Sequence, residues 1–149
     1  MAFKHLFKAK LGWDSTPIRY QKSHQIAIEG KENLNVSAAK AFKGDPALLN
    51  PEDLMLSAVV SCHMMSYLYV CSQNGIEVIS YQDNAEADLE VLHDGSGRIT
   101  AIRLYPKVVI RQIDKMEEAM HLHKKANELC FIANSCNFPI FHFPSCEVV

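Results

Sequence analysis

The chain carries five cysteines, and these are the residues whose chemistry is most distinctive. They stand at Cys62, Cys71, Cys130, Cys136 and Cys146. The number is odd and no Cys-x-x-Cys pair is present, which argues against a zinc site. In a reducing compartment they are free thiols, so a disulfide among them is expected to be transient and catalytic. We therefore expect no bound metal, and the role of each thiol depends on the element that positions it.

Cys62 lies within residues 50–75, the longest apolar stretch of the sequence. Asn50 can cap a helix, Pro51 suits its first position, and Gly75 can end it. Roughly 22 residues between these signals give about 33 Å of helix. Serines interrupt the run and no basic residues flank it, so we expect a buried central helix of a soluble protein rather than a membrane span. In such a helix a cysteine is either a nucleophile or a small core residue.

Composition narrows the class of protein. With 149 residues, 48% hydrophobic and 21% charged, the chain is expected to form one globular domain. The formal net charge of -2 and the scattered basic residues offer no surface for nucleic acid. The first ten residues alternate charged and apolar side chains and lack the apolar core of a secretion signal. We therefore expect a cytoplasmic protein with no nucleic-acid partner and no membrane attachment.

The rest of the chain reads as strands and one further helix. Period-two alternation and turn residues predict strands at residues 3–11, 24–29, 33–38, 76–80, 85–92, 98–110 and 138–149. The second helix is predicted to begin with Asp114 as its cap and to end near Ala133 to Asn134, with His123 and Cys130 on one face. The expected fold class is α+β, with two helices against antiparallel sheet.

Two segments resemble the cysteine motifs of the OsmC/Ohr family, the osmotically inducible and organic hydroperoxide resistance proteins. The first is Asn-Pro-Glu-Asp-Leu at residues 50–54 followed by Ser-Cys-His-Met at 61–64, and the second is residues 126–135. The predicted order of elements matches that family over residues 3–149. The resemblance implies an OsmC-like fold with antiparallel sheets around a long buried helix. It also implies a single domain over residues 1–149 and an intertwined homodimer with active sites at the interface.

The resemblance further implies a thiol peroxidase acting on small organic hydroperoxides. In that interpretation Cys62 is the peroxidatic cysteine and becomes a sulfenic acid, and Cys130 resolves it as a disulfide. Cys136, six residues beyond Cys130, could compete as the resolving thiol. No bound cofactor is implied, and the disulfide would be recycled by an external dithiol such as a lipoyl-type group.

Two further residues complete the expected site. Glu52 precedes Cys62 by ten residues, about 15 Å along one helix, so a shared site would need the glutamate of a partner subunit. The family's peroxidases also use an arginine beside the thiolate. Arg19 is the first candidate for this role because arginine stays charged and can bind a carboxylate through two nitrogens. Lys40 and Lys43 follow as candidates.

Two departures from the family pattern keep alternatives open. Phe131 stands where the family has proline after the second cysteine, and no arginine occupies a recognisable motif position. The first alternative is a non-catalytic dimeric protein of the same family that binds a ligand or senses redox state. The second is a different enzyme, such as a small acyl-thioesterase, in which Cys62 is only a core residue.

Overall fold

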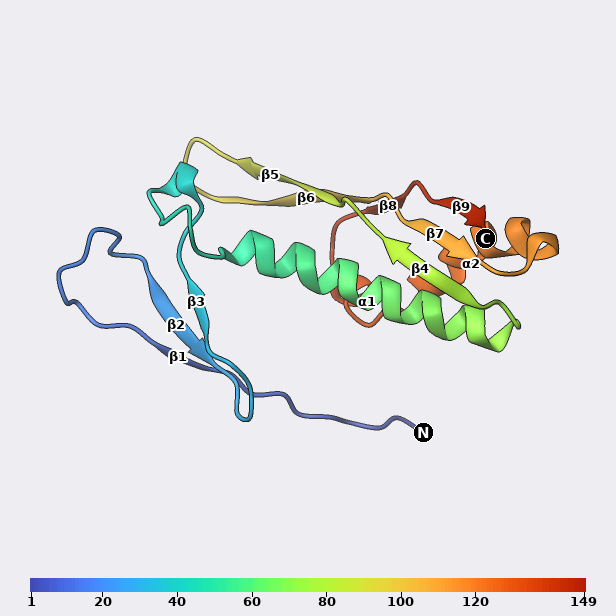
Figure 1. Ribbon diagram of the computed structural model, residues 1–149. Coiled ribbons are helices and arrows are strands. Elements are labelled where there is room, and N and C mark those ends of the chain that lie inside the picture. Colours follow the sequence, from blue (N-terminus) through green and yellow to red (C-terminus); the bar gives the residue numbers. More distant parts are fainter. The chain divides into compact units, whose positions relative to one another are not determined.

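The computed structural model describes all 149 residues, and they form two compact units, Met1–Leu54 and Met55–Val149. The first unit holds one antiparallel three-stranded sheet, seen in blue at the start of the chain in Figure 1. Its strands are β1 (Lys10–Gly12), β2 (His24–Ala27) and β3 (Leu34–Val36). The predicted strand pair around Gly30 is confirmed as β2 and β3. The expectation of a single domain over the whole chain stays a prediction.

The predicted first strand is much shorter than expected. Only Lys10–Gly12 forms β1, where Lys10 pairs with Ala27 of β2. The preceding residues are exposed, and no strand of the chain pairs with them. Alternation of apolar and charged side chains is therefore not sufficient here, because a strand also needs a neighbour for its backbone hydrogen bonds.

Helix α1 (Pro51–Gln73) begins and ends where the local signals predict. The Asn50 side-chain oxygen accepts a hydrogen bond from the Asp53 backbone N–H at 2.9 Å, and the Asp53 carboxylate accepts one from the Asn50 N–H at 3.2 Å. This reciprocal pair satisfies backbone donors that the helix itself leaves free. At the other end Gly75 takes a positive φ of 66°, which allows the chain to turn back.

The burial of α1 is less complete than its sequence predicts. Only one side is fully buried, and it carries Val59, His63, Tyr67, Val70 and Cys71. Large apolar residues on the remaining surface are exposed, namely Met55, Met65, Leu68 and Tyr69. By length and composition alone α1 could also cross a membrane, a test that core helices of globular proteins pass as well. Its apolar surface thus exceeds what the chain itself covers.

The second unit contains two three-stranded sheets in the orders β4-β7-β9 and β5-β6-β8. The strands are β4 (Val78–Gln82), β5 (Glu86–Val91), β6 (Gly97–Leu104), β7 (Lys107–Ile110), β8 (Ile140–His142) and β9 (Ser145–Val148). The predicted β5-β6 hairpin is confirmed as an antiparallel pair. The predicted strand over 98–110 was wrong in its continuity, because it breaks at Tyr105-Pro106 and its halves join different sheets.

The C-terminal segment also differs from its predicted single strand. Residues 138–149 form two strands interrupted near Pro144, as a proline in that position favours. Strand β8 pairs with β6, and β9 with β7, both in parallel. The α+β class is confirmed, but the sheets of this unit are mixed rather than purely antiparallel. The reason is that α2 lies in the connection between β7 and β8, and such a crossover returns the chain in the same direction.

Helix α2 (Met116–Leu129) differs from its predicted limits. Asp114 lies in a short 3-10 turn, Ile113–Lys115, and Lys115 precedes the helix without a side-chain cap, so Asp114 is not the cap. The helix ends four to five residues before the predicted end, and Cys130 takes an extended conformation immediately after it. Beyond it, Ala133–Ser135 forms another 3-10 turn. Cys130 therefore lies at the end of α2 rather than within a helix.

Candidate active site

The structure brings Cys62 and Cys130 together. Cys62 lies in the middle of α1, half-buried, and Cys130 lies directly after α2, fully buried. The Cys62 thiol is close enough to Cys130 to contribute to the raised pKa of the Cys130 thiol. Both residues belong to the second unit, so this contact is internal to one compact body. A buried thiol beside a half-buried one is an arrangement that suits disulfide formation between them.

The surroundings of Cys130 keep its thiol protonated. Burial first, and then the neighbouring Cys62 thiol, raise the pKa of the Cys130 thiol. The backbone N–H of Ala133 donates to the Cys130 sulfur at 3.4 Å and opposes part of this shift. A buried thiol of raised pKa is a poor first attacker on an external oxidant, because the thiolate is the nucleophile. Of the two, Cys62 is the more accessible sulfur.

Cys136 is placed differently. Its thiol donates a hydrogen bond to the Ile132 carbonyl at 3.2 Å, and its side chain packs against the core cluster of Val59, Ile102 and Leu104. Burial raises the pKa of the Cys136 thiol, with no contribution from Cys62. The structure therefore brings Cys130, and not Cys136, to Cys62. The positions of Cys130 and Cys136 in the sequence could not decide which of the two lies near Cys62.

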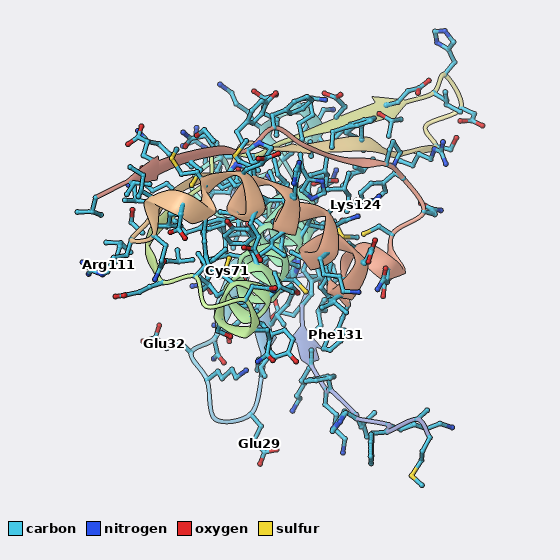
Figure 2. The ribbon with its side chains drawn as sticks, turned by 90° about the vertical axis from the view of Figure 1, so that its right-hand side faces the viewer. Glu29, Glu32, Cys71, Arg111, Lys124 and Phe131 are labelled. Carbon is cyan, nitrogen blue, oxygen red and sulfur yellow. The ribbon has the colours of Figure 1, made fainter.

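The remaining cysteines are Cys71, near the end of α1, and Cys146, in β9. Cys71, which Figure 2 labels, is fully buried, and Cys146 packs against the same core cluster. Burial raises the pKa of both thiols. Neither contributes to the environment of Cys130, so we assign them to the core.

Glu52 lies in the first unit, half-buried, at the start of α1. It lines a groove of about 260 Å³ together with Lys22 and His24. The Lys22 ammonium donates to the Phe42 carbonyl at 2.7 Å, which holds its side chain across this region. Sequence reasoning missed Lys22. The sequence feature that could have indicated Lys22 is its position two residues before β2, because His24 at the start of β2 lines the same groove.

The three cations favoured by the sequence are exposed, and none of them lines the groove of Glu52. The Arg19 guanidinium lies 5.2 Å from the centre of the neighbouring Tyr20 ring and makes no ion pair. Lys40 begins a short 3-10 turn, and Lys43 follows it with a positive φ of 61°. Within the first unit the basic side chains that line the groove with Glu52 are therefore Lys22 and His24.

Helix α1 is continuous over Glu52 and Cys62. Ten residues of helix span about 15 Å along the axis, so a site that uses both residues would need a second subunit, and the homodimer stays a prediction. No group of three or more histidine, cysteine or acidic side chains is arranged to hold a metal ion. The reactive side chains that the structure brings together at the candidate site are the thiols of Cys62 and Cys130.

The family model described as "OsmC-like protein" matches residues 44–141, which include both cysteines. The chain belongs to the OsmC family. A comparison with functionally curated proteins gives no match.

Several solved structures of OsmC proteins are similar to the chain over nearly its whole length. An OsmC-like protein of unknown function from Vibrio cholerae is 26% identical, with a TM-score of 0.82 over 98% of this chain and 100% of that one. An organic hydroperoxide resistance protein from Elizabethkingia anophelis is 17% identical, with a TM-score of 0.75 over 100% of both chains. One from Bacillus subtilis is 19% identical, with a TM-score of 0.61 over 97% and 100%. The last two show the fold alone.

The residue after the second cysteine, Phe131, departs from the proline of the OsmC family pattern. Phe131 is 82% exposed and points outward beyond the end of α2 in Figure 2. Because its side chain makes no part of the core, it does not displace Cys130 from Cys62. The departure from the family's proline is thus compatible with the thiol contact in this OsmC protein.

Proposed function

We propose that this protein is a cysteine-based thiol peroxidase that reduces organic hydroperoxides in the cytoplasm. The observation that carries the proposal is the contact between a half-buried thiol, Cys62, and a buried one, Cys130, across α1 and the end of α2. Family membership supports it, since the family includes organic hydroperoxide resistance proteins. No bound cofactor or metal takes part in the proposed reaction.

The chemistry needs two steps at the protein. The Cys62 thiolate attacks the terminal oxygen of the hydroperoxide, the O–O bond breaks, and an alcohol leaves after taking up a proton. Cys62 is then a sulfenic acid. The Cys130 sulfur attacks the Cys62 sulfur, its proton leaves with the sulfenic oxygen as water, and a disulfide forms. An external dithiol, such as a lipoyl-type group, returns both cysteines to thiols by exchange and is itself oxidised.

The proposal includes a homodimer with an active site at each interface. The exposed apolar side of α1, with Met55, Met65, Leu68 and Tyr69, is a surface that a second copy could cover. Cys62 is half-buried on the same helix. In the dimer the partner subunit's Glu52, with a cation from Arg19 or from the groove residue Lys22, would lie near Cys62 and stabilise its thiolate.

One observation favours a second candidate function. Arg19 stacks on Tyr20 and has no carboxylate partner, although an arginine held by the motif glutamate is what the family's peroxidases use. A family member without that cation would be a non-catalytic dimer that binds a ligand or senses redox state through Cys62 and Cys130. The two candidates differ in one measurable property, which is turnover.

The test is the consumption of tert-butyl hydroperoxide and of hydrogen peroxide by the purified protein with excess dihydrolipoamide. We expect wild type to turn over the organic peroxide at least ten times faster than hydrogen peroxide. Cys62→Ser should reduce turnover to the background rate. Cys146→Ser is the matched control, because it also replaces a half-buried thiol but lies outside the thiol pair.

Wild-type protein that consumes neither peroxide, while one equivalent of oxidant still converts Cys62 and Cys130 to a disulfide, would support the redox-sensing alternative. Equal activity in wild type and Cys62→Ser would exclude both candidates, since both depend on that sulfur.

A further inference from the structure

Two polar contacts join α1 to α2 inside the core of the second unit. The Tyr67 hydroxyl donates to the Ala119 carbonyl at 2.8 Å, and His63 Nε2 lies 3.0 Å from His123 Nδ1. On α1, His63 precedes Tyr67 by four residues, whereas on α2 His123 follows Ala119 by four. One helical turn on each helix therefore separates the contacts, and the two helices run antiparallel.

The two thiols are attached to the same two helices. Cys62 directly precedes His63 on α1. Cys130 follows His123 by seven residues and comes directly after the last residue of α2, in an extended conformation. The two polar contacts and the thiol pair therefore all depend on how α1 packs against α2. A shift of either helix by one turn would separate the sulfurs together with the two polar pairs.

The two histidines form a single, well-defined hydrogen bond. Their side chains are almost fully buried, with 1% of His63 and 3% of His123 exposed. Burial lowers the pKa of His63 to about 3 and that of His123 to about 4, so both rings are neutral near pH 7. A neutral imidazole offers one N–H donor and one acceptor, and here one ring donates to the other.

Neighbouring rings hold this pair in place. The Tyr67 ring stacks on His123 with centroids 3.9 Å apart and planes within 9°, and the His142 ring of β8 lies 4.5 Å from that of His63. The His63 Nδ1 atom has no partner. Burying His63 Nε2 and His123 Nδ1 costs free energy, which their hydrogen bond offsets. A shift of α1 along α2 would break this bond and leave both nitrogens without a partner. Apolar side chains tolerate such slippage far better.

We propose that the His63–His123 hydrogen bond is a positioning contact, which holds α1 and α2 in the register at which Cys62 and Cys130 form their disulfide. Neither imidazole touches the reacting sulfurs, so both are positioning residues and not catalytic ones. A buried polar pair that fixes the register of two helices is a well-attested use of such groups. The inference rests on the proposed function only in taking Cys62 and Cys130 as the redox pair.

The test measures the effective concentration of the two thiols without any peroxide. The reduced protein is equilibrated with glutathione and glutathione disulfide at pH 7. In this exchange two protein thiols and one glutathione disulfide give the protein disulfide and two glutathiones. Peptide mass spectrometry then quantifies the disulfide between Cys62 and Cys130. Each variant is assayed below the onset of its thermal unfolding, so that the folded protein is compared.

Two double variants separate register from mere packing. His63→Leu with His123→Leu removes the hydrogen bond but keeps an apolar core, and should lower the effective concentration at least tenfold. His63→Gln with His123→Asn keeps a donor and an acceptor near the original nitrogen positions, and should stay within threefold of wild type. His121→Gln, at an exposed position on α2, is the control for replacing a histidine on this helix.

The result that overturns the proposal is a leucine pair that folds and retains the wild-type effective concentration. Should the leucine pair not fold, Tyr67→Phe provides the second test, since it deletes only the hydroxyl that fixes the adjacent contact. We expect it to lower the effective concentration by two- to fivefold, and no change would contradict the proposal. Because no peroxide is present, a failure here is distinct from a failure of the peroxidase proposal.

Discussion

At the scale of single residues, environment separates thiols that look alike in the sequence. Cys130 and Cys136 are six residues apart, but only Cys130 contacts Cys62. Cys136 instead donates to a backbone carbonyl of its own segment. Burial raises the pKa of the Cys130 thiol, so little of it is thiolate. In the proposed reaction Cys62 therefore attacks the peroxide first, and Cys130 reacts afterwards.

This order of attack predicts the fate of oxidised Cys62. After one equivalent of tert-butyl hydroperoxide, Cys130→Ser should accumulate the Cys62 sulfenic acid, because the contacting sulfur is gone. Dimedone trapping followed by mass spectrometry should show at least ten times more adduct than in wild type. The matched variant Cys136→Ser should form the disulfide as wild type does. A rapid Cys62–Cys136 disulfide in Cys130→Ser would show that Cys136 can reach the site.

At the scale of elements, α1 has more apolar surface than its own chain covers. Its buried side packs into the second unit, while Met65 and Tyr69 are 56% and 58% exposed. Large exposed apolar residues gathered on one helix mark an interaction surface. A two-fold pair of α1 helices is the proposed arrangement, since it would also bring Glu52 of the partner subunit toward Cys62.

The proposed interface predicts a change of oligomeric state. Replacing Met65 and Tyr69 together by lysine should convert a dimer into a monomer, because two charges per subunit would have to be buried. Sedimentation velocity measures this directly. Ile113→Lys is the control, since Ile113 is a 76% exposed apolar residue in a turn outside α1. A monomeric wild type, or a lysine variant that stays dimeric, would refute an interface through this side of α1.

At the scale of the whole molecule, the second unit encloses three neutral imidazoles. Burial lowers the pKa of His63 and His123, to about 3 and about 4, and lowers that of His142 as well. In the unfolded chain each returns to its ordinary value of 6.5. Their contribution to stability is therefore complete above pH 6.5 and is lost as the pH falls toward the folded values.

Acid should consequently weaken the fold well before its carboxylates titrate. For His63 and His123 the free energy of unfolding should fall by about 2 kcal/mol each between pH 7 and pH 5. Urea unfolding at the two pH values measures this loss. The variant with His63→Gln and His123→Asn should lose less over the same range, because neither replacement titrates. An equal loss in both proteins would show that these histidines do not control acid stability.

Neighbouring residues alone are enough to specify several features of this protein. The limits of α1 follow from Asn50 and Gly75, and the β5–β6 hairpin from the turn at Gly95. Each rests on backbone conformations and hydrogen bonds within a few residues, which local composition specifies. The two cysteine motifs can also be identified from local sequence, because their residue types and spacing suffice to indicate the family.

Which distant residues meet depends instead on the tertiary structure. It breaks the predicted strand at Pro106, assigns its halves to two sheets, and pairs β8 and β9 in parallel with them. It also brings Cys130 to Cys62, His123 to His63, and Lys22 into the groove of Glu52. These pairings depend on how helices and strands pack across long stretches of sequence. Periodicity shows which side of an element is apolar, but not which partner covers it or in which register.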